Sequence, residues 1–385
     1  MKRIRVLVFV LGACFVSVAW SQQPARNCSP FWAEFHKDNM ERRNPCEKVL
    51  NVNNVGNLSL KWSYKTGNYV DSSPAVVNGV VYVGSLDKKV YALKASTGAK
   101  LWSYTTGWVV DSSPAVANGA VYVGSGDYNV YALNASTGTM LWSYPTGGLV
   151  DSSPAVANGV VFVGSSDGKV YALNASTGAL LWSYTTGDWV YSSPAVANGV
   201  VYVGSYDYNV YALNASTGTM LWSYPTGNSV YSSPAVANGV VFVGSLDGKV
   251  YALNASTGAL LWSHTIGRGV DSSPAVANGA VYVGSLDGKV YALNAKTGAK
   301  MWSYTTIGSY SVLSSVAVAN GVVYVGGGSM YWGVVYALNA KTGAKLWSYI
   351  TGGDVGSSPA VSNGVVYVGS EDNKVYAFGL KKGRK

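Results

Sequence analysis

The chain has 385 residues, and only 12% of them are charged, about half the share that is usual in soluble domains. Its 46 glycines and 29 tyrosines suit many short strands joined by tight turns, and they exclude a disordered chain. The net charge of +9 comes mostly from the two ends, so no basic stripe along the body favours nucleic-acid binding.

Residues 1–21 have the pattern of an export signal. Three basic residues precede an apolar stretch that is short for a membrane span, and small residues allow cleavage after Ser21. The alternative is a bacterial lipobox in which Cys14 is lipidated, although the apolar residues that follow Cys14 favour simple cleavage. We therefore expect an exported chain, periplasmic or secreted, whose mature form has no transmembrane segment.

Residues 22–56 form an extension in front of the repeats, and residues 381–385 form a basic tail behind them. Without Cys14, the cysteines that remain are Cys28 and Cys46. An even number of cysteines in an exported chain predicts a disulfide between them. This disulfide would stabilise a segment that has little core of its own.

Tryptophan recurs with a period of 40 residues from Trp62 to Trp302, and again at Trp347. Each copy contains four short runs rich in Val, Tyr and Trp. In the copy that includes Phe162, the turn signals Asn158-Gly159, Asp167-Gly168 and Ser176-Thr177-Gly178 separate them. Four strands in a 40-residue period are typical of one blade of a β-propeller.

The two ends of the repeat array complete each other. Residues 58–64 are a lone Trp strand, whereas the last copy stops before its Trp strand. The sequence therefore predicts an all-β fold over residues 57–380. We expect eight four-stranded antiparallel blades, closed into a ring when the strand of Trp62 joins the last blade.

Seven copies of a phrase such as YALNASTGALLW (171–182) resemble the tryptophan-docking motif of the pyrroloquinoline quinone (PQQ) repeat family. That resemblance implies that each Trp packs between adjacent blades, against the backbone near the Gly of a neighbouring motif. The implied docking residues are Trp62, Trp102, Trp142, Trp182, Trp222, Trp262, Trp302 and Trp347.

The resemblance leaves the activity open, because one fold hosts unrelated functions. The family includes quinoprotein dehydrogenases, but the sequence lacks their adjacent cysteine pair and their long calcium-binding insertions. Our first hypothesis is a monomeric, non-enzymatic scaffold without a cofactor, which binds a protein, peptide or small-molecule ligand. The alternatives are a small dehydrogenase that uses PQQ with calcium, and an outer-membrane assembly scaffold similar to BamB.

Residues 111–190 and 191–270 are near-identical copies, and nine of their 11 differences fall in two loop segments expected on one face. Drift after duplication explains variable loops, but a binding surface also explains why they became aromatic. The predicted aromatic face comprises Tyr69, Trp108, Tyr128, Trp189, Tyr206, Tyr208, Tyr310, Tyr331 and Trp332.

The residue before each Ser-Ser pair should lie at the mouth of the central channel, because the first strands of a propeller line that channel. Going round the ring, the predicted rim residues are Asp71, Asp111, Asp151, Tyr191, Tyr231 and Asp271. Such an Asp could simply organise a local Asx turn. Alternatively, the carboxylates would repel one another and could bind calcium or a cationic ligand beside the tyrosines.

Overall fold

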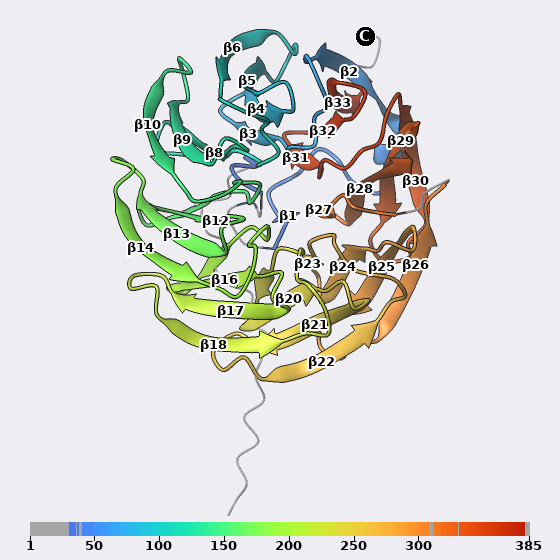
Figure 1. Ribbon diagram of the computed structural model, residues 1–385. Coiled ribbons are helices and arrows are strands. Elements are labelled where there is room, and N and C mark those ends of the chain that lie inside the picture. Colours follow the sequence, from blue (N-terminus) through green and yellow to red (C-terminus); the bar gives the residue numbers. More distant parts are fainter. Residues whose placement is uncertain (1–30, 36, 38–40, 308–310, 330, 382–385) are drawn as a thin grey trace, which may run out of the picture.

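The computed structural model describes residues 31–35, 37, 41–307, 311–329 and 331–381 (Figure 1). Eight antiparallel sheets stand around a central axis like the blades of a propeller. We number the blades 1 to 8 in chain order, from the blade that begins with β3 to the blade that begins with β31. Among the described residues, no helix is long and apolar enough to span a membrane.

Each blade has four strands, ordered from the axis outwards. The innermost strands are β3 (Ala75–Val77), β7 (Ala115–Ala117), β11 (Ala155–Ala157), β15 (Ala195–Ala197), β19 (Ala235–Ala237), β23 (Ala275–Ala277), β27 (Ala317–Ala319) and β31 (Ala360–Ser362). The second strands are β4 (Val80–Ser85), β8 (Ala120–Gly124), β12 (Val160–Gly164), β16 (Val200–Gly204), β20 (Val240–Gly244), β24 (Ala280–Gly284), β28 (Val322–Ser329) and β32 (Val365–Ser370).

The third strands are β5 (Lys89–Lys94), β9 (Asn129–Asn134), β13 (Lys169–Asn174), β17 (Asn209–Asn214), β21 (Lys249–Asn254), β25 (Lys289–Asn294), β29 (Trp332–Asn339) and β33 (Lys374–Leu380). The outermost strands are β6 (Lys100–Thr105), β10 (Met140–Pro145), β14 (Leu180–Thr185), β18 (Met220–Pro225), β22 (Leu260–Thr265), β26 (Lys300–Thr305), β30 (Lys345–Thr351) and β2 (Leu58–Lys65). A 3₁₀ turn, η2 (Val55–Asn57), leads into β2.

The ring closes as the sequence predicts. Strand β2 is the outermost strand of blade 8 and pairs antiparallel with β33, from Leu58 opposite Leu380 to Lys65 opposite Lys374. The N-terminal strand therefore covers an edge that would otherwise be open in the last blade.

Indole side chains join neighbouring blades. From Trp62 to Trp302, each Nε1–H donates to an Ala carbonyl of the next blade at 2.8–3.0 Å. The rings also cover a motif glycine: a Cβ on Gly178 would stand 2.7 Å from Trp142. Trp347 differs because the last copy lacks this turn, and its Nε1–H donates to the carbonyl of Leu58 instead.

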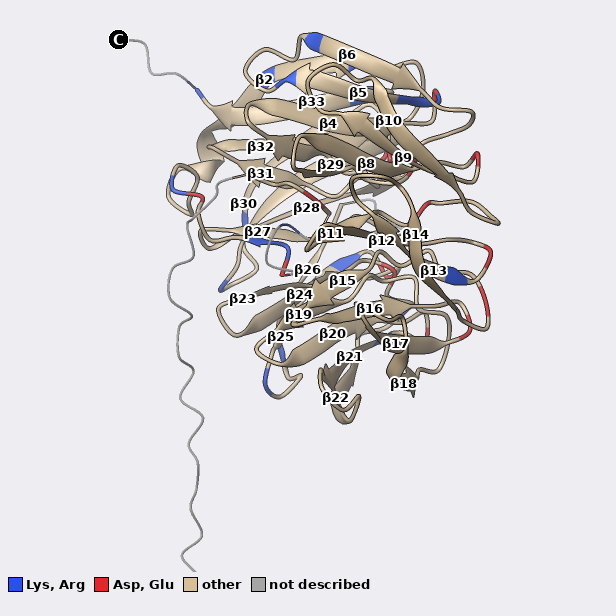
Figure 2. Cartoon of the chain, turned by 90° about the vertical axis from the view of Figure 1, so that its left-hand side faces the viewer, with Lys and Arg blue, Asp and Glu red and all other residues tan. Residues whose placement is uncertain are grey.

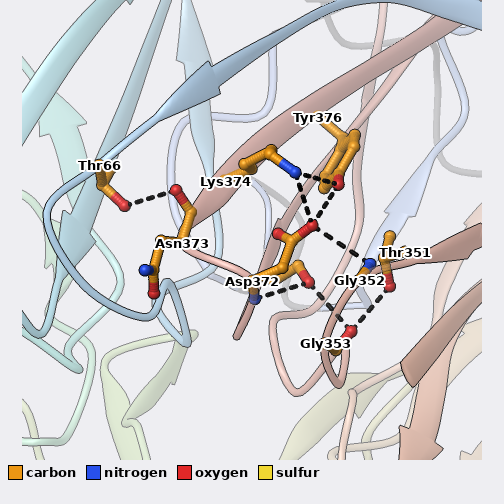
Figure 3. A network of polar contacts seen from close by, with 9 residues as sticks. Thr66, Thr351, Gly352, Gly353, Asp372, Asn373, Lys374 and Tyr376 are labelled. Carbon is orange, nitrogen blue, oxygen red and sulfur yellow. Dashed lines mark hydrogen bonds and ion pairs between the residues drawn. The ribbon is translucent and has the colours of Figure 1, made fainter. Parts of the chain in front are cut away.

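A turn aspartate makes a second junction between blades, illustrated by Asp372 in Figure 3. Its carboxylate accepts hydrogen bonds from the hydroxyl of Tyr376 and from the backbone N–H of Gly352, the latter at 3.2 Å. The same Asp–Tyr pair recurs in six other blades. The aspartate of the hairpin turn thus connects that turn to the preceding link, whether or not a glycine follows it.

The Ser-Ser pairs form a hydrogen-bonded ring around the channel, which we call the serine belt. The backbone N–H of the second serine in each blade donates to the hydroxyl of its counterpart in the next blade at 2.8–3.0 Å. Ser358 donates to Ser73 and closes the circle. The belt members are buried, so each link satisfies a polar group that water cannot reach.

The extension enters the channel instead of lying outside the ring. Strand β1 (Arg43–Asn44) pairs parallel with β27 and lies near the centre of the ring in Figure 1. Trp32 exchanges backbone hydrogen bonds with Val76 of β3 at 2.6 and 2.9 Å, and Glu34 accepts one from the backbone of Val156 at 3.1 Å. We call the described residues 31–35, 37 and 41–47 the plug. The predicted Cys28–Cys46 disulfide stays a prediction, because Cys28 lies outside the described residues.

Candidate functional site

The six rim residues stand directly before the serine belt, each at the entrance to an innermost strand. Because the belt holds equivalent residues of successive blades side by side, it brings Asp71, Asp111, Asp151, Tyr191, Tyr231 and Asp271 together at one mouth of the channel. All six side chains are partly buried. The plug contacts the middle of the innermost strands further along the axis, so part of the chain itself lies in the channel beyond this mouth.

The rim carboxylates lack partners. None of the four accepts a hydrogen bond from a described residue, and Oδ1 of Asp71 is buried without one. The local Asx turn would require such a bond to nearby backbone. These aspartates are therefore not explained by turn capping.

Burial shifts the rim carboxylates towards the protonated form. It raises the pKa of Asp71 to about 7, with further contributions from the charges of Asp111, Glu371 and Asp354. Burial likewise raises the pKa of Asp111 and of Asp271 to about 6, and in Asp111 the charge of Asp151 adds to it. These groups are desolvated acids that a cation would stabilise in their ionised form.

Two further acids belong to this site, and the sequence analysis did not include them. The charges of Asp354 and Glu371 add to the burial that raises the pKa of Asp71. Blade 8 also lies beside Asp71, because a Cβ on Gly356 would stand 3.7 Å from its Oδ1. Asp354 lies in the link and Glu371 in the hairpin turn, and the backbone N–H of Glu371 donates to the carbonyl of Asp354 at 2.9 Å. In the sequence, the position before the Ser-Ser pair of blade 8 is Gly356, so the rim pattern gave no signal for them.

Four aromatic rings form a cluster on the opposite part of the rim. Tyr191 and Tyr231 stack, while Trp189 and Tyr206 lean against them with ring centroids 5.3–5.7 Å apart. Burial, followed by the charge of Asp271, raises the pKa of Tyr231 well above its usual value. The phenols therefore stay neutral and present aromatic surface and hydroxyl groups beside the carboxylates.

The rest of the predicted aromatic face divides by exposure. Tyr69, Trp108, Tyr128, Tyr208 and Tyr331 are exposed, whereas Trp332 is half-buried and packs against the core between blades 6 and 7. The ammonium of Lys88 lies 4.3 Å from the ring centroid of Trp108, so this face already contains one cation–π pair. Tyr310 lies outside the described residues.

Figure 2 shows that acidic residues gather on loops along one side of the ring, the side of the channel mouth. The described residues contain no group of three or more His, Cys, Asp or Glu side chains placed to hold one metal ion. The rim thus offers separate carboxylates instead of a converging ligand set for calcium. A groove of about 520 Å³ lies on the opposite face, between Tyr82 and Val116, but no charged side chain lines it.

A family model described as the β-propeller of a beta-alanine-activating enzyme matches residues 110–326, more than half of the chain. A model of outer membrane protein assembly factor BamB matches residues 49–153 and 311–385. No curated protein matches the sequence significantly.

Solved structures of low sequence identity share the fold. BamB from Moraxella catarrhalis is 20% identical with a TM-score of 0.73, and the match covers 84% of this chain and 99% of BamB. A quinohemoprotein alcohol dehydrogenase from Pseudomonas putida is 20% identical with a TM-score of 0.78, covering 93% of this chain and 81% of the enzyme. The computationally designed protein Ika8 is 20% identical with a TM-score of 0.73, covering 82% and 97%.

These neighbours include an assembly factor, an oxidoreductase and a designed protein, so their likeness concerns the fold alone. The eight closed blades, the docked tryptophans and the family models agree with one another. The chain belongs to the PQQ-like β-propeller family.

Proposed function

We propose that this chain is an exported, non-enzymatic binding protein that holds a cationic ligand at the mouth of its channel. The observation that supports this function is the meeting of unpaired carboxylates with an aromatic cluster on one rim. The chemistry of the rim suits an ammonium or guanidinium group, carried by a small molecule or by a basic side chain of a peptide.

Two physical terms favour such a ligand. A cation offsets the repulsion between Asp71 and Asp111, and it restores the solvation that burial removed. The faces of Tyr191 and Tyr231 add cation–π attraction, worth about 0.5–2 kcal/mol depending on desolvation. An anionic ligand would gain neither term and would be repelled by the rim.

The test is thermal unfolding of the chain from residue 22 onwards, titrated with choline, spermidine or calcium chloride at pH 8. We expect choline or spermidine to raise Tm by about 3–5 °C at 100 times its Kd. The double variant Asp111→Asn/Asp151→Asn should reduce this rise. Asp188→Asn should reduce it less, because Asp188 is exposed and acts on the site only through its charge on Tyr191 and Tyr206. If no cation shifts Tm, or if the double variant responds like the parent, the rim is not a cation site.

A measured enzymatic activity would contradict the proposal of a non-enzymatic binding protein. The same preparation is mixed with PQQ and calcium, and dye reduction is followed with alcohols and sugars as substrates. Sustained turnover would identify a dehydrogenase and overturn the non-enzymatic function, whatever the cation titrations gave.

Export is a separate part of the proposal. We expect mass spectrometry of the chain from a bacterial periplasm to give an N-terminus at residue 22 and a linked Cys28–Cys46 pair. A diacylglyceryl group on Cys14 would instead place the chain on a membrane and favour an assembly scaffold similar to BamB.

A further inference from the structure

A second surface lies on the face opposite the channel mouth, at the first residue of each outermost strand. In seven blades this residue pairs with the same leucine of the third strand: Lys100, Met140, Leu180, Met220, Leu260, Lys300 and Lys345. Equal register in equivalent blades places these residues at one height along the axis. They therefore lie on one circle, which we call the outer rim.

Half of the outer rim is apolar. In blades 2 to 5 the first two residues of the outermost strand are both large and apolar, and all eight side chains are 44–52% exposed: Met140, Leu141, Leu180, Leu181, Met220, Leu221, Leu260 and Leu261. Neighbouring blades meet along this arc, because the hydroxyl of Tyr104 lies 3.3 Å from the sulfur of Met140, and Tyr184 contacts Met220 in the same way.

This arc stands on unprotected sheet edges. Strands β10, β14, β18 and β22 are each the last strand of their sheet. Proteins usually guard such edges with charged side chains, lysine above all, and monomers rarely leave a long apolar patch in water. Blades 1, 6 and 7 follow that rule with Lys100, Lys300 and Lys345, whereas the four blades between them do not.

The other half of the outer rim is basic, with Lys100, Lys300 and Lys345 at the same register. Three more exposed lysines lie beside them, at the end of the third strand or in the turn that follows it: Lys94, Lys296 and Lys341. None of these six lysines forms an ion pair among the described residues. No acidic residue balances them, since every Asp and Glu after residue 50 lies in a link or a hairpin turn of the opposite face. The net charge of the whole chain therefore does not reveal that lysines lie on one face and acidic residues on the other.

We propose that the outer rim docks the propeller onto an anionic lipid membrane surface. A plane is the one shape that can touch the apolar and the basic half of a flat circle together. Apolar side chains would enter the interface while lysines contact acidic headgroups, each worth about 1 kcal/mol near the surface. A second copy of the chain fits less well, because face-to-face pairing would set lysines against lysines with no carboxylate between them.

The experiment is vesicle co-sedimentation of residues 22–385, which lack the apolar signal segment, and of residues 22–380, which also lack the basic tail. We expect both chains to bind phosphatidylcholine vesicles that contain 30% phosphatidylglycerol, and to bind pure phosphatidylcholine at least tenfold more weakly. Binding should fall severalfold between 0.1 and 0.5 M NaCl, as the headgroup attraction is screened.

The decisive variant is Leu180→Lys/Met220→Lys, which places the residue of blades 1, 6 and 7 at the same register and should fold normally. We expect binding to drop at least fivefold although two positive charges are added. Tyr208→Lys is the matched control on the opposite face, where blade 1 has Lys88, and it should not weaken binding. If Leu180→Lys/Met220→Lys binds as well or better, or if neither vesicle binds, the membrane surface is excluded and an acidic protein partner takes its place.

Discussion

Tyr191 and Tyr231 occupy the same position in consecutive blades, and their rings stack with centroids 5.1 Å apart and planes 13° from parallel. In four other blades the equivalent rim residue is aspartate. In these two blades the stacked tyrosines form a continuous aromatic surface. We expect Tyr231→Leu to weaken choline binding about 5- to 30-fold, through loss of the cation–π term. Calorimetric titration measures this change, with Tyr208→Leu as the control. Equal affinities for parent and variant would remove the tyrosines from the site.

The channel mouth should make the free protein less stable as pH rises. The folded pKa of Asp71, about 7, exceeds its ordinary value of 3.8, so the unfolded chain loses this proton at lower pH than the folded chain. The free energy of unfolding therefore falls from about pH 4 to pH 7, and the loss is complete above pH 7. We expect Asp71→Asn to stabilise the protein by roughly 1–3 kcal/mol at pH 8, and very little at pH 4.

Asp127→Asn is the contrasting variant for urea unfolding at both pH values. Its carboxylate accepts hydrogen bonds from Tyr131 and Gly107 at 2.7 and 2.6 Å, so its loss should destabilise the protein by about 1–3 kcal/mol at pH 8. If Asp127→Asn stabilises the protein, its hydrogen bonds do not hold the blades together. If Asp71→Asn destabilises it at pH 8, Asp71 is not an unpaired buried acid.

Choline affinity of the parent should rise between pH 5 and pH 8, because the cation needs ionised carboxylates.

Alanine substitutions at two glycines can distinguish the cost of backbone strain from the cost of disrupting tryptophan docking between blades. Gly159 and Gly178 have φ values of +77° and +74°, but only at Gly178 would a Cβ collide with an indole, that of Trp142. We expect Gly159→Ala to cost about 1–2 kcal/mol from the left-handed backbone alone. Gly178→Ala should cost at least 2 kcal/mol more, because Trp142 must leave its site. Urea unfolding measures both, and equal losses would show that docking contributes little to stability.

Ring closure can be separated from the plug by two truncations. A chain that starts at residue 57 keeps β2 and loses the plug, whereas one that starts at residue 67 loses both. We expect the first to stay monomeric with a lower Tm and the second to aggregate through the exposed edge of β33. Size-exclusion chromatography distinguishes them. A monomeric second chain with the Tm of the first would show that β2 is dispensable.

The fold could be predicted from the sequence because its causes repeat. Tryptophan recurs every 40 residues from Trp62 to Trp302, and an Asn-Gly turn is present in every blade, so each copy supports the others. The path of the plug could not be predicted in this way. Glu34 and Arg42 look like surface residues in the sequence, but both are buried, since unpaired backbone groups at the inner sheet edges offer them hydrogen-bond partners.

The candidate site was predictable position by position but not in its contacts. The rim pattern placed Tyr191 and Asp71 at the channel, because each precedes a Ser-Ser pair. The contact of Trp189 with Tyr206 depends on how a link meets a hairpin turn, which no period encodes. Asp354 and Glu371 likewise reach the mouth through the geometry of blade 8.

The plug forms hydrogen bonds to six of the eight blades, in their order around the ring. Trp32, Ala33 and Glu34 bond to blades 1, 2 and 3 in turn, and Glu41, Arg42 and Asn44 bond to blades 6, 7 and 8. Near-identical 40-residue units invite gain or loss of whole copies by unequal recombination. A ring of seven or nine blades would put this segment out of step with its partners. The hydrogen bonds of the short N-terminal segment therefore fit a ring of eight blades.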